Sequence, residues 1–225
     1  IQKYLTNEDK ELKITNGLDE ILDWLRRNET YATFFIVGDI LEKKPDILDK
    51  INSQGHEIGF HTMFHNRLDD ENYNKEKFKD EIKKFNELTN NHSKGFRAPT
   101  FSLNEKSSWV IDVLEEFGYE YDSSIVPVKT RMYGLENAEE KPYFISSNNL
   151  KENNPNGKIK EFPLLVTKFL GKKIPAAGGF YVRTLPTKII KNAIKKYEKK
   201  EIPATFYIHS WELTPQHMPK ISMSK

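Results

Sequence analysis

The sequence predicts an α/β fold in which helices cover a mainly parallel sheet. Its apolar residues alternate between helical spacing and short continuous runs, and six of these runs are interpreted as strands separated by helices. Strands that alternate with helices pair in parallel through crossover connections. The length of 225 residues suits one large domain, 1–225, because α/β barrels of this size do not need to split.

The individual elements follow from apolar spacing and from the residues that end it. Helices are predicted where apolar side chains recur every three or four positions up to a Gly or Asn, at 18–28, 45–55, 78–88, 108–117 and 189–197. Strands are predicted at 31–37, 56–60, 95–98, 119–122, 159–166 and 204–208. The first and last strands share an apolar pattern, ATFFI and ATFYI, and are expected to be equivalent buried strands.

The number of strands leaves two architectures open. An open doubly wound sheet accepts six strands, whereas a closed barrel needs at least one more, whose natural place is before residue 1. The polar stretch 129–157, rich in Asn and Glu, is expected to run over the rim of the barrel or sheet.

Charge and composition exclude several classes of protein. The chain has 35 Lys and Arg against 33 Asp and Glu, so no strong field directs it to nucleic acid or to a membrane surface. It has no Cys, which excludes a disulfide scaffold and a Cys nucleophile and leaves His and carboxylates as metal ligands. No apolar run approaches the roughly 20 residues of a spanning helix, and residues 1–4 do not resemble a signal peptide. We therefore expect a cytoplasmic protein without a membrane-spanning segment.

Two histidines directly follow the predicted strand 56–60. In parallel α/β folds, sites form at the carboxyl ends of strands, and His61 and His65 lie there, four positions apart in HTMFH. That spacing lets both imidazoles point the same way, which suits a Zn²⁺-type ion. A pair of partly exposed rim histidines is the alternative. His56 opens the strand at its opposite end and is interpreted as structural.

Three further polar residues end the later strands. Arg97 in RAPTF can reach inward to a carboxylate, or it can extend along the rim. Asp122 in YDSS occupies the equivalent place one strand later, or it caps a turn. His209 follows strand 204–208 beside Trp211, as a general acid whose pKa a carboxylate can tune or as a satisfied core histidine. Their common position at one rim favours a site.

The ordered series of motifs resembles the polysaccharide deacetylase family, also called the NodB-homology or carbohydrate esterase 4 family. HTMFH at 61–65 matches the family's H-[ST]-x-x-H metal motif, RAP at 97–99 its R-x-P motif, and FYIH at 206–209 its late strand-His motif. Further matches, similar to a sub-branch associated with envelope and exopolysaccharide synthesis, lie at 121–124, 161–163, 176–179 and 211–212. The resemblance covers about residues 17–215 and implies a distorted (β/α) barrel.

The resemblance also implies a metal-dependent carbohydrate N-deacetylase. His61 and His65 would hold a divalent metal, with Zn²⁺ favoured, which polarises an N-acetyl carbonyl and activates water. Arg97 would orient the catalytic base by a charge-assisted hydrogen bond. His209 would protonate the departing amine, and Asp122 would keep His209 charged. The substrate would be an N-acetylated glycan or sugar, and the products would be acetate and a free amino sugar.

One motif of the family has no match in residues 1–17. This first motif, T-F-D-[DE]-G, supplies the general-base Asp and an Asp metal ligand. The missing strand and the missing motif are the same gap, so the sequence is expected to begin just downstream of it. If the 225 residues were the whole chain, the protein would be an inactive relative that binds glycans or serves as a scaffold. An amidohydrolase acting on a small acetylated amine is the other alternative.

Overall fold

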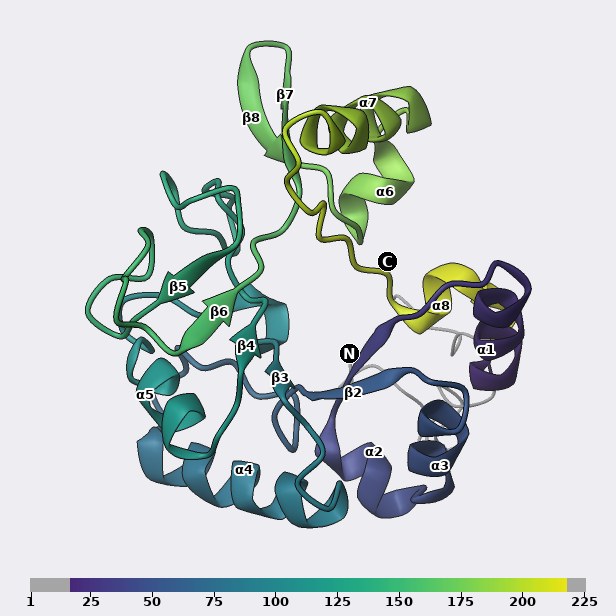
Figure 1. Cartoon of the computed structure of the whole chain (residues 1–225), viewed down its shortest axis with the longest axis vertical. Coiled ribbons are helices and arrows are strands. Elements are labelled where there is room, and N and C mark those ends of the chain that lie inside the picture. The colour runs from purple at the N-terminus through teal and green to yellow at the C-terminus, as the bar shows by residue number, and fades with distance from the viewer. Residues whose placement is uncertain (1–16, 218–225) are drawn as a thin grey trace, which may run out of the picture.

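The computed structural model describes residues 17–217, which contain a six-stranded sheet (Figure 1). The strands run in the order β1-β2-β3-β4-β6-β5, and every neighbouring pair is parallel except β6 and β5. Their bounds are β1 (Thr33–Ile36), β2 (Glu57–Phe60), β3 (Gly95–Phe96), β4 (Tyr121–Asp122), β5 (Tyr143–Ile145) and β6 (Ile159–Glu161). The predicted α/β class with a mainly parallel sheet is confirmed. Within residues 17–217 this sheet is open, with β1 and β5 at its edges, and forms no closed barrel.

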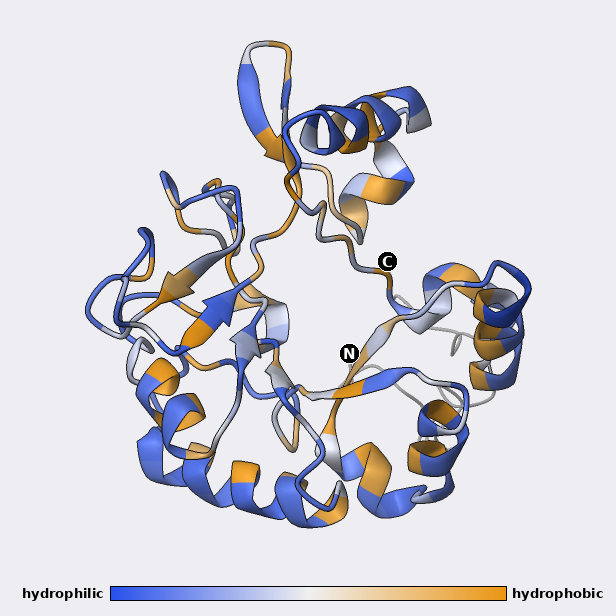
Figure 2. Ribbon diagram, in the orientation of Figure 1, coloured by the Kyte–Doolittle hydropathy of each residue, from blue (hydrophilic) through white to orange (hydrophobic). Residues whose placement is uncertain are grey.

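Helices of the N-terminal half lie along the outside of this sheet (Figure 1). They are α1 (Leu18–Arg27), α2 (Gly38–Lys43), α3 (Asp46–Asn52), α4 (Lys75–Leu88) and α5 (Trp109–Glu116). Each has a hydrophobic and a hydrophilic face, which Figure 2 shows as orange and blue. All of them except the short α2 correspond to predicted helices. No helix among residues 17–217 combines the length and the apolarity that crossing a membrane requires.

An aromatic cluster fixes the two central strands to the longest helix. Phe60 of β2 lies 4.7 Å from Phe85 of α4 and 5.6 Å from Phe96 of β3, between ring centroids. Phe78 of α4 lies 5.4 Å from Phe96, and all four rings are fully buried. Aromatic pairs at these separations add to the free energy gained by burying their area. The two strands that lead into the predicted site therefore end in a fully buried aromatic cluster.

The C-terminal half builds a second unit above the sheet in Figure 1, around its own apolar cluster. The hairpin β7 (Val166–Phe169) and β8 (Lys172–Pro175) is followed by α6 (Phe180–Thr184) and the predicted basic helix, α7 (Thr187–Glu198). The chain then returns to the sheet and ends its described part in α8 (Ser210–Leu213) and a 3₁₀ turn, Pro215–His217. The hairpin and α6 were not predicted.

Three of the predicted strands differ in the structure. The strand predicted at 159–166 forms only in part, because β6 ends at Glu161 and Val166 begins the separate strand β7. The strand expected at 204–208 is wrong: only Thr205 pairs, in an isolated parallel bridge with Leu164. The physical reason is that the segment beside it leaves the sheet: β6 ends at Glu161, and the chain then turns away into the hairpin that begins at Val166. Only one bridge can therefore form. The third difference concerns β1, which forms as predicted but is only half-buried along its length, because it lies at the edge of the sheet.

Candidate active site

The loop after β2 carries the predicted pair of histidines. The rings of His61 and His65 lie 5.0 Å apart, between centroids. His61 Nδ1 lies 2.6 Å from the carbonyl oxygen of Arg97 and donates its proton to it, because a carbonyl oxygen only accepts. This contact leaves Nε2 of His61 without a proton. Such a hydrogen bond to the backbone is the usual way in which a metal-binding histidine is oriented.

Burial keeps both imidazoles neutral. It lowers the pKa of His61 to about 3, with the nearby His65 acting in the same direction. Partial burial and the charge of His209 also lower the pKa of His65 below its ordinary value. A neutral imidazole is the form that binds a metal ion. Among residues 17–217, however, no cluster of three or more His, Cys, Asp or Glu side chains suited to a metal is present.

The backbone of this loop is strained and firmly anchored. Thr62 and His65 adopt left-handed φ angles of 59° and 56°, which are unfavourable for residues with a Cβ. The loop is held by hydrogen bonds from the N–H of Gly38 to the oxygen of Thr62 and from the N–H of Met63 to Glu81 Oε2. Strain of this kind persists only where the surroundings impose it, and it concentrates at functional sites.

Arg97 lies at the end of β3, with its guanidinium held between strands. Nε donates to the Ser123 carbonyl oxygen at 2.8 Å, and Nη2 donates to Ser123 Oγ at 2.7 Å. Its Cζ lies 4.4 Å from the centre of the Phe35 ring, within the range of a cation–π contact. Burial lowers the pKa of Arg97 to about 10, while the charges of Glu161 and Asp122 oppose that shift. Arg97 therefore stays charged at neutral pH.

The turn after Arg97 is strained in the same way as the loop that carries His61 and His65. Thr100 and Phe101 have φ angles of 55° and 51° in the 3₁₀ turn Pro99–Phe101. The N–H groups of Phe101 and Ser102 bond to the oxygens of Ala98 and Pro99.

His209 is paired with a carboxylate that the sequence reasoning missed. Nδ1 of His209 lies 3.2 Å from Glu212 Oε2, and the same oxygen accepts the His209 backbone N–H at 2.9 Å. The Glu212 side chain is 6% exposed, and Arg183 Nε lies 3.3 Å from its other oxygen. The spacing of three residues is that of a capping box, with His209 before the first turn of α8 and Glu212 inside it. The sequence HSWE at 209–212 contains this pattern, which could have indicated the pairing of His209 with Glu212.

The carboxylate that contacts His209 in the structure is Glu212 and not Asp122, which was expected there. The physical reason is register: Asp122 belongs to β4, where its backbone pairs with β3 and β6, and its side chain is fully buried beneath the rim. Its carboxyl group contacts Ser124 and Glu161 instead of His209. Burial lowers the pKa of His209, whereas the hydrogen bond and the charge of Glu212 raise it.

The ring of Tyr207 connects the two halves of the site. It lies 5.4 Å from the ring of His209, and Arg97 Cζ lies 6.0 Å from its centre. Trp211 stacks on the other side of His209 at 4.2 Å, almost parallel. The backbone at Tyr207 packs directly against Gly178. A Cβ at Gly178 would overlap the Tyr207 carbonyl oxygen, and the φ angle of Gly178 is 139°. His61, His65, Arg97 and His209 are thus brought together, and Asp122 is not part of that group.

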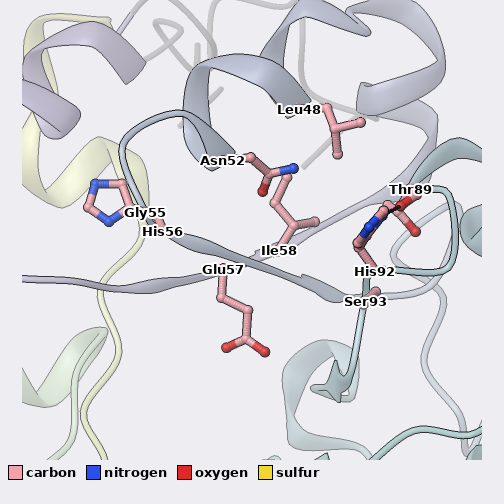
Figure 3. Close-up of a pocket in the computed structure, with 9 residues that line it drawn as sticks. All are labelled: Leu48, Asn52, Gly55, His56, Glu57, Ile58, Thr89, His92 and Ser93. Carbon is pink, nitrogen blue, oxygen red and sulfur yellow. Dashed lines mark hydrogen bonds between the residues drawn. The ribbon is translucent and has the colours of Figure 1, made fainter.

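A pocket lies away from these residues, at the end of the sheet where His56 precedes β2 (Figure 3). Figure 3 shows the His56 ring and the Glu57 carboxylate pointing away from Asn52 and His92. The His56 ring packs 5.6 Å from Phe34, and its nitrogens have no hydrogen-bond partner within the described chain. Because the polar side chains of this pocket diverge, we retain the structural interpretation of His56.

Comparisons with known proteins agree with the motifs. The model of the polysaccharide deacetylase family matches residues 3–121, and a domain of unknown function, DUF3473, matches residues 123–225. A peptidoglycan-N-acetylglucosamine deacetylase of Bacillus cereus is 34% identical over 124 residues, which are 51% of this chain and 56% of that protein. A chitooligosaccharide deacetylase of Sinorhizobium fredii is 39% identical over 46 residues, 20% of this chain and 21% of that protein.

Solved structures show the same fold. A probable polysaccharide deacetylase from Pseudomonas aeruginosa PAO1 has a TM-score of 0.57 at 16% identity, covering 86% of this chain and 60% of that one. The Puue allantoinase has a TM-score of 0.55 at 17% identity, with the same coverage of 86% and 60%. The chain spans only 22–56% of the length of the first curated relatives. The family model matches more than half of the sequence, and the chain belongs to the polysaccharide deacetylase family.

Proposed function

We propose that this chain is part of a metal-dependent hydrolase that removes N-acetyl groups from the amino sugars of a polysaccharide or a glycan precursor. The observation that carries the proposal is the shared rim, where two neutral imidazoles lie near a partly buried arginine and a histidine paired with a carboxylate. The printed names of the relatives, which act on peptidoglycan and chitooligosaccharides, support an acetylated glycan as substrate.

The two histidines fit a divalent metal. His61 donates through Nδ1 to a carbonyl, which fixes its tautomer and leaves Nε2 as a ligand, and His65 lies beside it on the same loop. Imidazole nitrogens suit Zn²⁺. When bound by His61 and His65, the metal would supply a Lewis acid for the acetamide carbonyl and a water of lowered pKa.

The other rim residues prepare the bond cleavage. The overall reaction adds water across the amide: a hydroxyl joins the carbonyl carbon, the C–N bond breaks, and the amine leaves with a proton. Arg97 holds a fixed positive charge next to the histidine loop, suited to orienting a carboxylate base. The strained turn at Thr100 follows Arg97 directly, and its backbone N–H would be the donor toward a developing oxyanion.

His209 supplies the proton for the leaving amine. Its Nδ1 is committed to Glu212, so Nε2 is the nitrogen that carries the transferable proton. The stacked Trp211 fixes the ring plane, and Glu212 stabilises the charged form. The carboxylate base and the third ligand that the family resemblance implies belong to the family's first motif, which has no match in residues 1–17.

Acetate release tests the proposal. The full-length protein would be stripped with a chelator and incubated with chitooligosaccharides and with monomeric N-acetylglucosamine, with and without added Zn²⁺. We expect acetate from the oligomers only after metal is restored. Acetate from the monomer or from small acetylated amines alone would favour the small-substrate amidohydrolase. Glycan binding without acetate release would favour the inactive relative.

A further inference from the structure

Two buried carboxyl groups lie side by side beneath the rim, and the proposed reaction uses neither. Asp122 and Glu161 are register partners on the parallel strands β4 and β6, and both side chains are 0% exposed. Paired in this register, they point to the same face of the sheet. The two carboxyl groups are within hydrogen-bonding reach of each other.

Each carboxyl group has one satisfied oxygen and one unsatisfied oxygen. Asp122 Oδ1 accepts a hydrogen bond from Ser124 Oγ at 2.5 Å, and Glu161 Oε1 accepts one from the Ile125 N–H at 2.9 Å. Asp122 Oδ2 and Glu161 Oε2 are buried and have no donor among residues 17–217. A buried acceptor without a donor is costly, and two adjacent acceptors cannot satisfy each other. One proton between them turns both into a hydrogen-bonded pair.

The guanidinium of Arg97 is a positive charge that interacts with both carboxyl groups of this pair. Arg97 bonds to Ser123, the residue after Asp122, and Ser123 Oγ in turn donates to the Phe162 oxygen, the residue after Glu161. The guanidinium is therefore tied to the ends of both strands that carry the carboxyl groups. The other titratable group that faces the pair is the phenol of Tyr143 on β5, which donates to the Leu150 oxygen at 2.5 Å and whose pKa is raised by burial.

Charge arithmetic selects the protonation state. With one shared proton, the pair carries a single negative charge that balances the single positive charge of Arg97. With no proton, it would bury two negative charges against one positive charge, and with two protons it would leave Arg97 uncompensated. Unpaired charges in a protein interior are strongly unfavourable.

We propose that Asp122 and Glu161 act as one acid that keeps a single proton between Oδ2 and Oε2, and that this singly charged pair is the counter-charge that positions Arg97 at the rim. Both are positioning residues, since they act through Arg97. The inference rests on the proposed function only for the role of Arg97 in catalysis, because the charge balance itself is a property of the fold.

The first experiment measures the proton through stability. An unfolded chain releases this proton above about pH 5, whereas the folded pair retains it, so the folded state loses stability as the pH rises. The variant Glu161→Gln offers an N–H to Asp122 Oδ2 and removes the proton from both states. We expect the folding constant of Glu161→Gln relative to wild type to increase by up to tenfold per pH unit from about pH 5. A ratio that does not change with pH would overturn the proposal.

The matched control is Glu120→Gln, which removes an exposed carboxylate beside the same strand and sets the baseline for losing one charge. Infrared spectroscopy gives an independent readout. Wild-type protein at pH 7 should show the carbonyl band of a neutral carboxylic acid, and Glu161→Gln should lack it. The presence of the same band in Glu161→Gln would contradict the shared proton. These measurements need neither metal nor substrate, so they remain decisive if the proposed activity fails.

A double-mutant cycle tests the link to Arg97. Asp122→Asn and Glu161→Gln each leave one carboxyl group to balance Arg97, whereas the double variant leaves none. We expect the double variant to lose at least tenfold more in folding constant than the two single changes predict together. In an Arg97→Met background this excess should vanish. Additive effects in the wild-type background, or an excess that persists without Arg97, would overturn the positioning role. Chemical denaturation still gives the folding constant of variants that are only partly folded.

Discussion

The two halves of the candidate site are held in very different ways. His61, His65 and Arg97 follow parallel strands whose rings pack into the main core, and their loops are strained and anchored by backbone hydrogen bonds. His209 follows a segment that belongs to no strand: it has one isolated bridge, at Thr205, and a hydrogen bond from the Tyr207 N–H to the Ala177 oxygen, and the neighbouring Ile208 is 43% exposed. The half that we propose to bind a metal is thus fixed by the sheet. The proposed proton donor is fixed locally, by a capping carboxylate and a stacked indole.

This difference coincides with the two family models. The polysaccharide deacetylase model ends at residue 121 and the DUF3473 model begins at residue 123, so the junction lies at Asp122. Metal binding and proton donation are assigned to opposite sides of this junction. If the comparison is right, changes in one half should leave the other half intact.

The largest expected effect comes from the metal-binding half. His61→Ala and His65→Ala should each abolish metal binding and reduce kcat/KM by on the order of 10²–10³-fold or more, since the Lewis acid is lost. Metal content after Zn²⁺ loading, measured by mass spectrometry, checks this. His56→Ala, at the other end of β2, is the matched control and should retain its metal. Full metal content in His61→Ala would contradict the assignment.

The next effect separates the halves directly. His209→Ala should leave metal content unchanged and lower kcat by roughly 10²–10⁴-fold, because the amine then leaves without its acid. The measurements are metal analysis and steady-state acetate release on one preparation. The control is His217→Ala. His217 lies in the 3₁₀ turn after α8 and contacts Glu20 of α1, so this variant tests whether any loss of a histidine contact in the segment lowers the activity. Loss of metal in His209→Ala would show that the halves are not independent.

A smaller effect is expected at the boundary between the halves. Arg97→Lys keeps the charge but loses the two-pronged contact with Ser123, so kcat/KM should fall roughly tenfold to a hundredfold with metal still bound. Arg67→Lys is matched, since Arg67 makes a similar fork to Asp69 at 2.9 Å outside the site. If Arg97→Lys and Arg67→Lys were equally active, the two-pronged contact of Arg97 with Ser123 would have no role in the reaction.

The smallest effect is a shift in pH dependence. Glu212 raises the pKa of His209 against the effect of burial, so Glu212→Gln should lower that pKa further. A general acid must be protonated, so the alkaline limb of the kcat/KM profile should move to lower pH. The acid limb, which belongs to a different group, should stay in place. A limb that moves to higher pH would show that Glu212 does not stabilise the imidazolium.

The sequence was most informative where local signals and the tertiary fold agree. The helices at α1, α3, α4, α5 and α7 and the strands β1 to β4 are recognisable from spacing and stop residues. His61, His65 and Arg97 are predictable because the ends of parallel strands share one edge. The strand at 204–208 failed because its pairing depends on where a distant neighbour turns away, which apolar content does not encode. Glu161 was missed because only register reveals which carboxyl faces Asp122.

The close packing of the Tyr207 backbone against Gly178 has a consequence for protein engineering. A methyl group at Gly178 would collide with the carbonyl oxygen of Tyr207, two residues before His209. Alanine at this position is therefore expected to displace Tyr207 and, with it, the proposed proton donor His209. If the proposed function is right, such a variant would bind an acetylated glycan but cleave it more slowly than the wild-type protein, which would make it useful for capturing substrates.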